Sequence, residues 1–151
     1  MQQTSEELVE GAREELKRAD HSIYVSLKYT RTVDIIKNII KRLINAYDFA
    51  ILEMLYYLKE KKKISDVPSV SKKRAAFLAF SHSPFKKDID FYFFLREIDA
   101  AHFTKREEYR KNVALITQVN GKPIEVDIET VKGYFDRTVT FVDAVHALVL
   151  K

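Results

Sequence analysis

The sequence predicts an all-α fold, an up-down bundle of four to five helices with one small β-hairpin before the last helix. Residues 32–63 hold no glycine or proline, and their apolar side chains recur at steps of three and four, which is a helical period. The same steps recur near both ends of the chain. An Asn120–Gly121 pair separates two strand-like runs over Val113–Ile128, which is typical of a tight hairpin turn. At 151 residues, 46% of them hydrophobic, the chain is expected to form a single helical-bundle domain over 1–151.

Two helices are expected to open the bundle as an antiparallel pair. Thr4 and Glu7 have the spacing of a capping box and predict the start of the first helix. The helical pattern weakens over Ser26–Thr32, where hydroxyl and β-branched residues gather. Thr30 or Thr32 then caps a second helix that is roughly 45 Å long at about 1.5 Å per residue.

The second half of that long helix is expected to be buried. From Ala46 to Leu58 only Asp48 and Glu53 interrupt an otherwise apolar surface. A helix that is apolar nearly all round needs neighbours on several sides. We therefore expect the other helices to surround this segment.

The middle of the chain predicts a loop and two further helices. Pro68 marks a loop, and Ser71 precedes a short helix. Ser83–Pro84 predicts the start of the next helix, which carries the most aromatic part of the chain and is expected to run through Phe103. This aromatic helix is either buried on several sides or forms a homodimer interface.

The last third changes from helix to strand and back. Thr104 and Glu107 again have capping-box spacing, so we expect a kink or a helix restart there, followed by a charged, solvated segment. Pro123 confines the second strand of the hairpin to a sheet edge. Since a two-stranded ribbon is marginal alone, it is expected to lie on the bundle or to pair with another copy. The last helix is expected to start near Asp127.

Composition excludes several classes of protein. The chain has no cysteine, so disulfide frameworks and thiol chemistry are excluded, and three glycines cannot make a phosphate-binding loop. No apolar run approaches the ~20 residues of a membrane helix, and the N-terminal residues lack a signal-peptide pattern. We expect a cytoplasmic protein, and the abundance of Lys and Glu suits a heat-adapted one. The net charge of +4 permits a nucleic-acid partner.

Lysine-rich clusters flank the loop before the short helix. Such charge can contact phosphates, and neighbouring Tyr or Phe rings can stack on unpaired bases. The alternative is a solvated lysine-rich loop. The candidate nucleic-acid-binding residues are Lys61, Lys62, Lys63, Lys72, Lys73 and Arg74.

Arg96 and His102 are the candidate catalytic pair, expected near the end of the aromatic helix. A guanidinium can hold a phosphate, and an imidazole can move a proton near neutral pH. Together they could support metal-free RNA cleavage, in which the ribose 2′-hydroxyl attacks the neighbouring phosphate. The alternative is structural, with His102 buried beside the aromatic cluster and Arg96 in a salt bridge.

The helical bundle, the Arg-x5-His pattern of Arg96 and His102, and the helix that follows resemble the HEPN superfamily. The resemblance implies a four- to five-helix bundle that dimerises. It also implies metal-independent cleavage of RNA, with Arg/His pairs that meet across the dimer. Other members are inactive, or act as partners of nucleotidyltransferases in toxin–antitoxin pairs. On this interpretation the protein binds or cleaves RNA or a nucleotide and needs no metal or cofactor.

Two other function classes remain open. Asp99/His102 and Asp143/His146 repeat a carboxylate-x-x-His spacing, which in ferritin-like bundles contributes to a di-metal site. In that case Asp48 or Glu53 would serve from the long helix, and Glu15 from the first. The third possibility is a dimeric interaction or scaffold protein without enzymatic activity.

Overall fold

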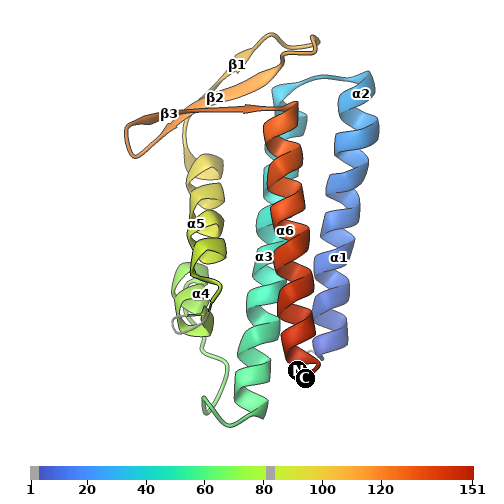
Figure 1. Ribbon diagram of the computed structural model, residues 1–151. Helices are drawn as coiled ribbons and strands as arrows, with labels where there is room; N and C mark the ends of the chain where they lie inside the picture. Colours follow the sequence, from blue (N-terminus) through green and yellow to red (C-terminus); the bar gives the residue numbers. More distant parts are fainter. Residues whose placement is uncertain (1–3, 81–83) are drawn as a thin grey trace.

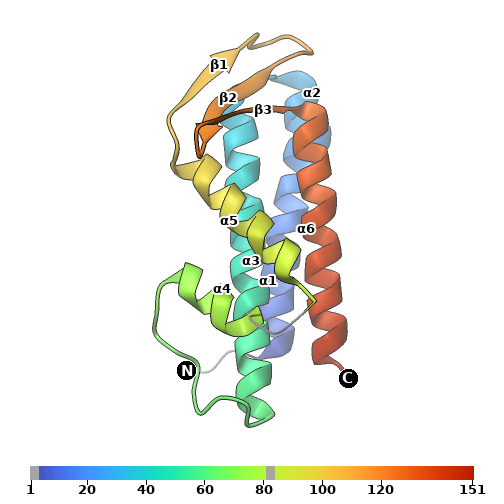
Figure 2. The same ribbon diagram turned by 60° about the vertical axis from the view of Figure 1, so that its left-hand side comes forward.

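The computed structural model describes residues 4–80 and 84–151. Three long helices lie side by side, two shorter ones cover one side of them, and a small sheet crosses one end (Figure 1). The long helices are α1 (Ser5–His21), α3 (Val33–Glu60) and α6 (Ile128–Val149). The shorter ones are α4 (Lys72–Phe80) and α5 (Lys86–Ala100), and α5 runs obliquely from α4 to the sheet (Figure 2). The predicted helical bundle is thus confirmed, with a larger β-sheet than expected.

Local capping bonds set the starts of the long helices. Thr4 Oγ1 accepts a hydrogen bond from the backbone N–H of Glu7 at 3.1 Å, as the capping-box spacing predicts. Thr32 Oγ1 accepts one from the N–H of Ile35 at 3.4 Å and caps α3. The predicted starts of these two helices are therefore confirmed.

Helical structure continues further after α1 than the sequence indicated. A π-helical turn, η1 (Ser22–Ser26), and the short α2 (Leu27–Tyr29) carry the chain on, with Ile23 and Leu27 buried against the bundle. Only Thr30–Thr32 then connects to α3, so α1 and α3 form the expected antiparallel pair. Apolar contacts of Ile23 and Leu27 thus sustain helix across a segment of weak propensity.

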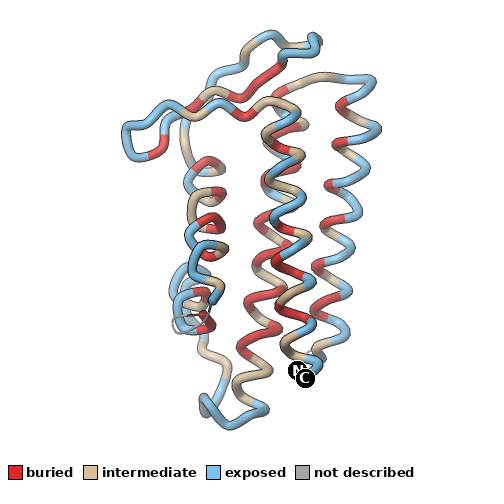
Figure 3. The backbone as a smooth tube through the Cα atoms, viewed as in Figure 1, coloured by how far each residue is buried: buried red, intermediate tan, exposed pale blue. Residues whose placement is uncertain are grey.

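The second half of α3 lies in the centre of the bundle, as predicted. α3 contacts α1, α4, α5 and α6, and buried positions recur along its length (Figure 3). The buried residues of this half include Ala46, Tyr47, Ala50, Ile51, Met54 and Leu55. Glu53 is buried with them and is only 1% exposed.

The aromatic helix ends earlier in the structure than the sequence predicted. α5 begins at Lys86 and ends at Ala100 instead of running through Phe103, and Ser83 lies outside the described residues. Ala101 is extended, with φ −78° and ψ 155°, and Phe103–Arg106 forms strand β1. No helix restarts at Thr104, because the backbone of this segment pairs with a strand that follows in the sequence.

The sheet has three antiparallel strands in the order β1-β2-β3, where β2 is Ala114–Val119 and β3 is Lys122–Asp127. Asn120 and Gly121 both have positive φ, 54° and 76°, which confirms the predicted hairpin turn. Pro123 lies in the edge strand β3, also as predicted. Leu115 and Val126 are fully buried, so the sheet lies on the bundle.

The charged segment between β1 and β2 is mostly exposed, as expected, and two hydrogen bonds anchor it. The backbone N–H of Tyr109 donates to the carbonyl of Arg31 at 2.6 Å. Glu108 Oε2 accepts a hydrogen bond from the N–H of Val33 at 2.9 Å, which satisfies a free donor at the start of α3. These two bonds tie the turn to the bundle.

Candidate functional site

Arg96 lies on α5 against Tyr92, one turn earlier on the same helix. Its Nη1 donates to the Tyr92 hydroxyl at 3.4 Å, and its guanidinium carbon is 5.6 Å from the centroid of that ring. The Tyr92 hydroxyl in turn donates to Asp48 Oδ1 at 2.5 Å. Burial, with the Asp48 carboxylate beside it, raises the pKa of Tyr92, so the phenol keeps its proton and remains a donor. Arg96 has no carboxylate partner among the described residues.

A row of two cations with two rings between them connects α4 to α5. Lys72 Nζ lies 3.0 Å from Asp48 Oδ2, on the carboxylate that holds Tyr92. Lys73 Nζ lies 5.3 Å from the centroid of the Phe93 ring, and the Phe93 and Tyr92 rings are 5.7 Å apart. The order is therefore Lys73, Phe93, Tyr92, Arg96. We call this row, with Lys72 and Arg74, the α4–α5 basic face.

The other predicted lysines lie in the turn that ends α3, at the end of the bundle away from the sheet (Figure 2). Lys61, Lys62 and Lys63 are exposed, and Lys61 Nζ lies 5.7 Å from the centroid of the Tyr57 ring. None of the three has a carboxylate partner in the part of the chain that the structure describes. Cations at this position also interact favourably with the carbonyl end of the helix.

His102 lies beyond the end of α5, which corrects the expectation that it shares a helix with Arg96. It is exposed and lines a hollow of about 520 Å³ with Phe103, Ile116 and Pro123, beside the sheet. Its backbone carbonyl accepts a hydrogen bond from Thr117 Oγ1 at 2.6 Å. Over residues 4–80 and 84–151, no contact joins His102 to Arg96. Within a single chain, Arg96 and His102 are therefore not brought together as a catalytic pair.

The aromatic side chains of α5 are divided between the core and the surface. Phe91 and Tyr92 are buried against Tyr47, with ring centroids 6.3 and 5.5 Å away. Phe93 and Phe94 are half-buried. The helix is thus held by the bundle on one side, and a homodimer through it stays a prediction.

The paired Asp/His motifs do not converge. Asp99 Oδ1 lies 3.8 Å from Lys37 Nζ, and Asp143 Oδ1 lies 3.8 Å from Arg13 Nη2. His146 is buried within the bundle, whereas His102 is exposed at the sheet. Within the described residues, no group of three or more His, Asp or Glu side chains is arranged to hold a metal ion. The geometry therefore gives the di-metal hypothesis no support.

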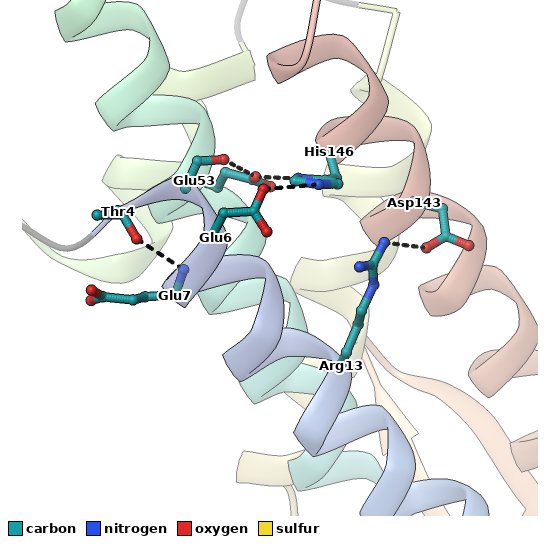
Figure 4. A network of polar contacts seen from close by, with 8 residues as sticks. Thr4, Glu6, Glu7, Arg13, Glu53, Asp143 and His146 are labelled. Atoms are coloured by element: carbon teal, nitrogen blue, oxygen red, sulfur yellow. Dashed lines mark hydrogen bonds and ion pairs between the residues drawn. The ribbon is translucent and has the colours of Figure 1, made fainter.

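A buried polar cluster lies at the opposite end from the sheet (Figure 4), and its contacts were not predicted, although Glu53 and His146 were both named in the di-metal hypothesis. Glu53 Oε2 accepts a hydrogen bond from Ser5 Oγ at 2.6 Å and lies 2.7 Å from His146 Nδ1. His146 Nε2 lies 4.0 Å from Glu6 Oε1. The one available signal was a carboxylate on the apolar half of a helix, because such a group needs partners. Since Ser5 bonds to Glu53 and has no bond to His146, the arrangement differs from a Ser-His-Asp triad.

No family model, curated protein or solved structure matches this chain. The resemblance to the HEPN superfamily therefore rests on the bundle and on Arg96 and His102. Within the described residues, no helix is both long and apolar enough to cross a membrane.

Proposed function

We propose that the protein binds single-stranded RNA along the α4–α5 basic face. The observation that carries the proposal is the row Lys73, Phe93, Tyr92, Arg96, in which two neighbouring rings lie between two cations across two helices. Single-stranded nucleic acids are bound by this combination, because cations contact phosphates and exposed rings stack on bases. Phe93, which is half-buried, is the ring that remains accessible to a base.

The charges on this face are free to meet phosphates. Lys73, Arg74 and Arg96 have no carboxylate partner among the described residues. Asp48, which lies between the two helices, is engaged by Tyr92 and Lys72. Each cation that neutralises a phosphate releases counterions, so binding by this face depends on salt.

Cleavage of the bound RNA is the second part of the proposal. The HEPN-like pattern implies that Arg96 holds a phosphate and that His102 moves a proton. Because no contact joins the two side chains within one chain, we place cleavage in a dimer, where residues of two copies meet at one phosphate. The binding proposal does not depend on this step.

Fluorescence anisotropy with a labelled single-stranded RNA tests binding. The double variant Lys73→Gln/Arg74→Gln is expected to bind about tenfold more weakly at moderate salt, with a shallower salt dependence. Lys17→Gln is the matched control, since Lys17 is exposed on α1, away from α4 and α5. If the double variant binds like the wild type, the face is not the RNA site.

Cleavage of the same RNA is measured separately, in the presence of EDTA. The proposal expects the wild type to cleave it and His102→Ala to lose this activity.

A second candidate function, a self-associating interaction protein, is favoured by the outer surface of α4. Phe77 is 62% exposed, its neighbour Leu78 is exposed as well, and so is Val70 in the loop before the helix. Exposed apolar groups of this size mark contact surfaces when they form one patch. Sedimentation of the wild type and of Phe77→Ser distinguishes the cases. A dimer that dissociates in the variant supports self-association, and a wild-type monomer at high concentration contradicts it.

A further inference from the structure

A second cavity lies at the end of the bundle where α1 begins and α6 ends, remote from the sheet. It has a volume of about 330 Å³, and its wall includes Ser5 from α1 and Glu53, Tyr56, Tyr57 and Glu60 from α3. That volume lies at the lower end of the range of small-molecule sites, roughly 300–1,000 Å³. No lysine or arginine of the described residues lines the cavity.

Glu53 has one carboxylate oxygen without a partner at this cavity. The contacts with Ser5 and His146 both end on Oε2, which leaves Oε1 without a hydrogen bond among the described residues. The side chain is only 1% exposed, so bulk water reaches little of it. Carboxylate oxygens normally accept more than one bond each, so Oε1 keeps the capacity to accept from a ligand. Glu53 is part of the cavity wall and therefore provides a strong acceptor there.

The rest of the wall suits a positively charged ligand. Tyr56 and Tyr57 provide ring faces, which attract cations through their quadrupoles. Tyr57 already interacts in this way with Lys61, whose Nζ is 5.7 Å from the ring centroid. Glu60 adds a second carboxylate near the solvent. The cavity thus combines a buried acid, two aromatic rings and an exposed acid.

We propose that this cavity binds a small aliphatic diamine, with one ammonium group on Glu53 Oε1 and the other on Glu60. The two glutamates lie two helical turns apart on α3, and seven residues correspond to about 10.5 Å along the helix axis. With each carboxylate level with its own position on the helix, charge-assisted hydrogen bonds of about 2.8 Å at each end would leave about 5 Å between the two nitrogens. A short carbon chain spans that distance, and the rings of Tyr56 and Tyr57 flank it.

Titration calorimetry with butane-1,4-diamine and with butylamine, on protein free of nucleic acid, tests the proposal. The diamine is expected to bind at least tenfold more tightly than the monoamine, because only the diamine reaches both carboxylates. In Glu60→Gln this advantage is expected to disappear, while butylamine binds as before. Absence of diamine binding, or equal affinity for the two amines in the wild type, overturns the proposal.

Further variants separate the site from general charge effects. Glu97→Gln removes an exposed carboxylate of α5 and is expected to leave the affinity for the diamine unchanged. Glu53→Gln is expected to abolish binding of both amines in protein whose circular dichroism shows that it is folded. Should Glu53→Gln fail to fold, Tyr56→Leu gives a second test at the inner wall, with weaker binding of both amines expected and unchanged binding contradicting the proposal.

Discussion

The carboxylate of Glu53 in α3 lies 2.7 Å from Nδ1 of His146 in α6, 93 positions later in the chain. Ser5 donates to the same oxygen from the first turn of α1. One buried atom thus connects the three long helices at the end opposite the sheet. The Glu53 side chain is only 1% exposed, so its partners determine whether its burial is tolerated.

Removal of His146 is expected to destabilise the protein strongly. Among the described residues, His146→Ala leaves Ser5 as the one remaining partner of the Glu53 carboxylate, and breaking a buried pair costs about 3 kcal/mol of unfolding free energy. Urea denaturation measures the difference. The neighbouring Asp143→Ala is the control, because the 3.8 Å contact of Asp143 with Arg13 is exposed and contributes less than about 1 kcal/mol. Equal losses in the two variants would contradict the role of the buried pair.

Two glycines within helices are expected to respond oppositely to alanine. A Cβ at Gly11 would lie 2.7 Å from Cε1 of Phe49, so Gly11→Ala forces the ring aside and lowers stability by about 1–3 kcal/mol. A Cβ at Gly133 would meet nothing within 4 Å. Gly133→Ala therefore raises stability by up to about 1 kcal/mol through helix propensity. Thermal unfolding of both variants checks the sign, and stabilisation by Gly11→Ala would show that Phe49 moves freely.

Two buried tyrosines are expected to differ when the hydroxyl is removed. The Tyr47 hydroxyl is buried beside Thr138 but makes no well-formed hydrogen bond among the described residues, and burial raises its pKa, so it remains neutral. Tyr47→Phe removes an unsatisfied polar group and is expected to stabilise the protein by about 1 kcal/mol. Tyr92→Phe removes the 2.5 Å bond to Asp48 and is expected to destabilise it by about 1–2 kcal/mol. Urea denaturation of both variants tests this difference in sign.

The cap of α6 is expected to make stability depend on pH below about 4. The backbone N–H of Thr130 donates to Asp127 Oδ1 at 2.8 Å and holds the pKa of that carboxyl below its usual value. Asp127 therefore stabilises the fold above the unfolded-state pKa, near 3.9, and this contribution disappears as pH falls through the lower folded-state pKa.

Asp127→Ala is expected to lose about 1 kcal/mol at pH 7, because the cap is lost. The difference from the wild type should shrink as the pH falls below about 4. Asp127→Asn keeps an oxygen for the cap without a titratable group, so its own contribution stays constant with pH. Urea denaturation at pH 7 and pH 3 provides the measurement, and a difference that is unchanged between the two would contradict the titration of Asp127.

Interactions within a few residues could be predicted from the sequence. Thr4, Thr32 and Asp127 cap helices through backbone groups three positions ahead, and the turn at Asn120–Gly121 needs only its own two residues. The apolar half of α3 also predicted its own burial. In each case the pattern and the structure that it predicts lie in the same short segment, so no knowledge of distant residues was needed.

The arrangement of the predicted catalytic and nucleic-acid-binding residues could not be predicted from short segments in this way. Arg96 and His102 would be related by a helical spacing only if α5 continued through His102. The helix ends at Ala100, so that spacing does not apply. The basic residues of α4 were recognised as candidates, yet their contact with Phe93 depends on how α4 packs on α5. The spacing along the chain could not show which cations and rings meet.

The sequence by itself determined where the main helices begin, which face of α3 is buried and where the hairpin turns, because each follows from hydrogen bonds and apolar periodicity within a segment. Only the tertiary structure decided that Phe103–Arg106 is a strand, since its backbone pairs with Ala114–Thr117 and not with its own neighbours. The same holds for the contact of Glu53 with His146. A buried carboxylate must find its partner wherever packing places one, and that partner can lie anywhere along the chain.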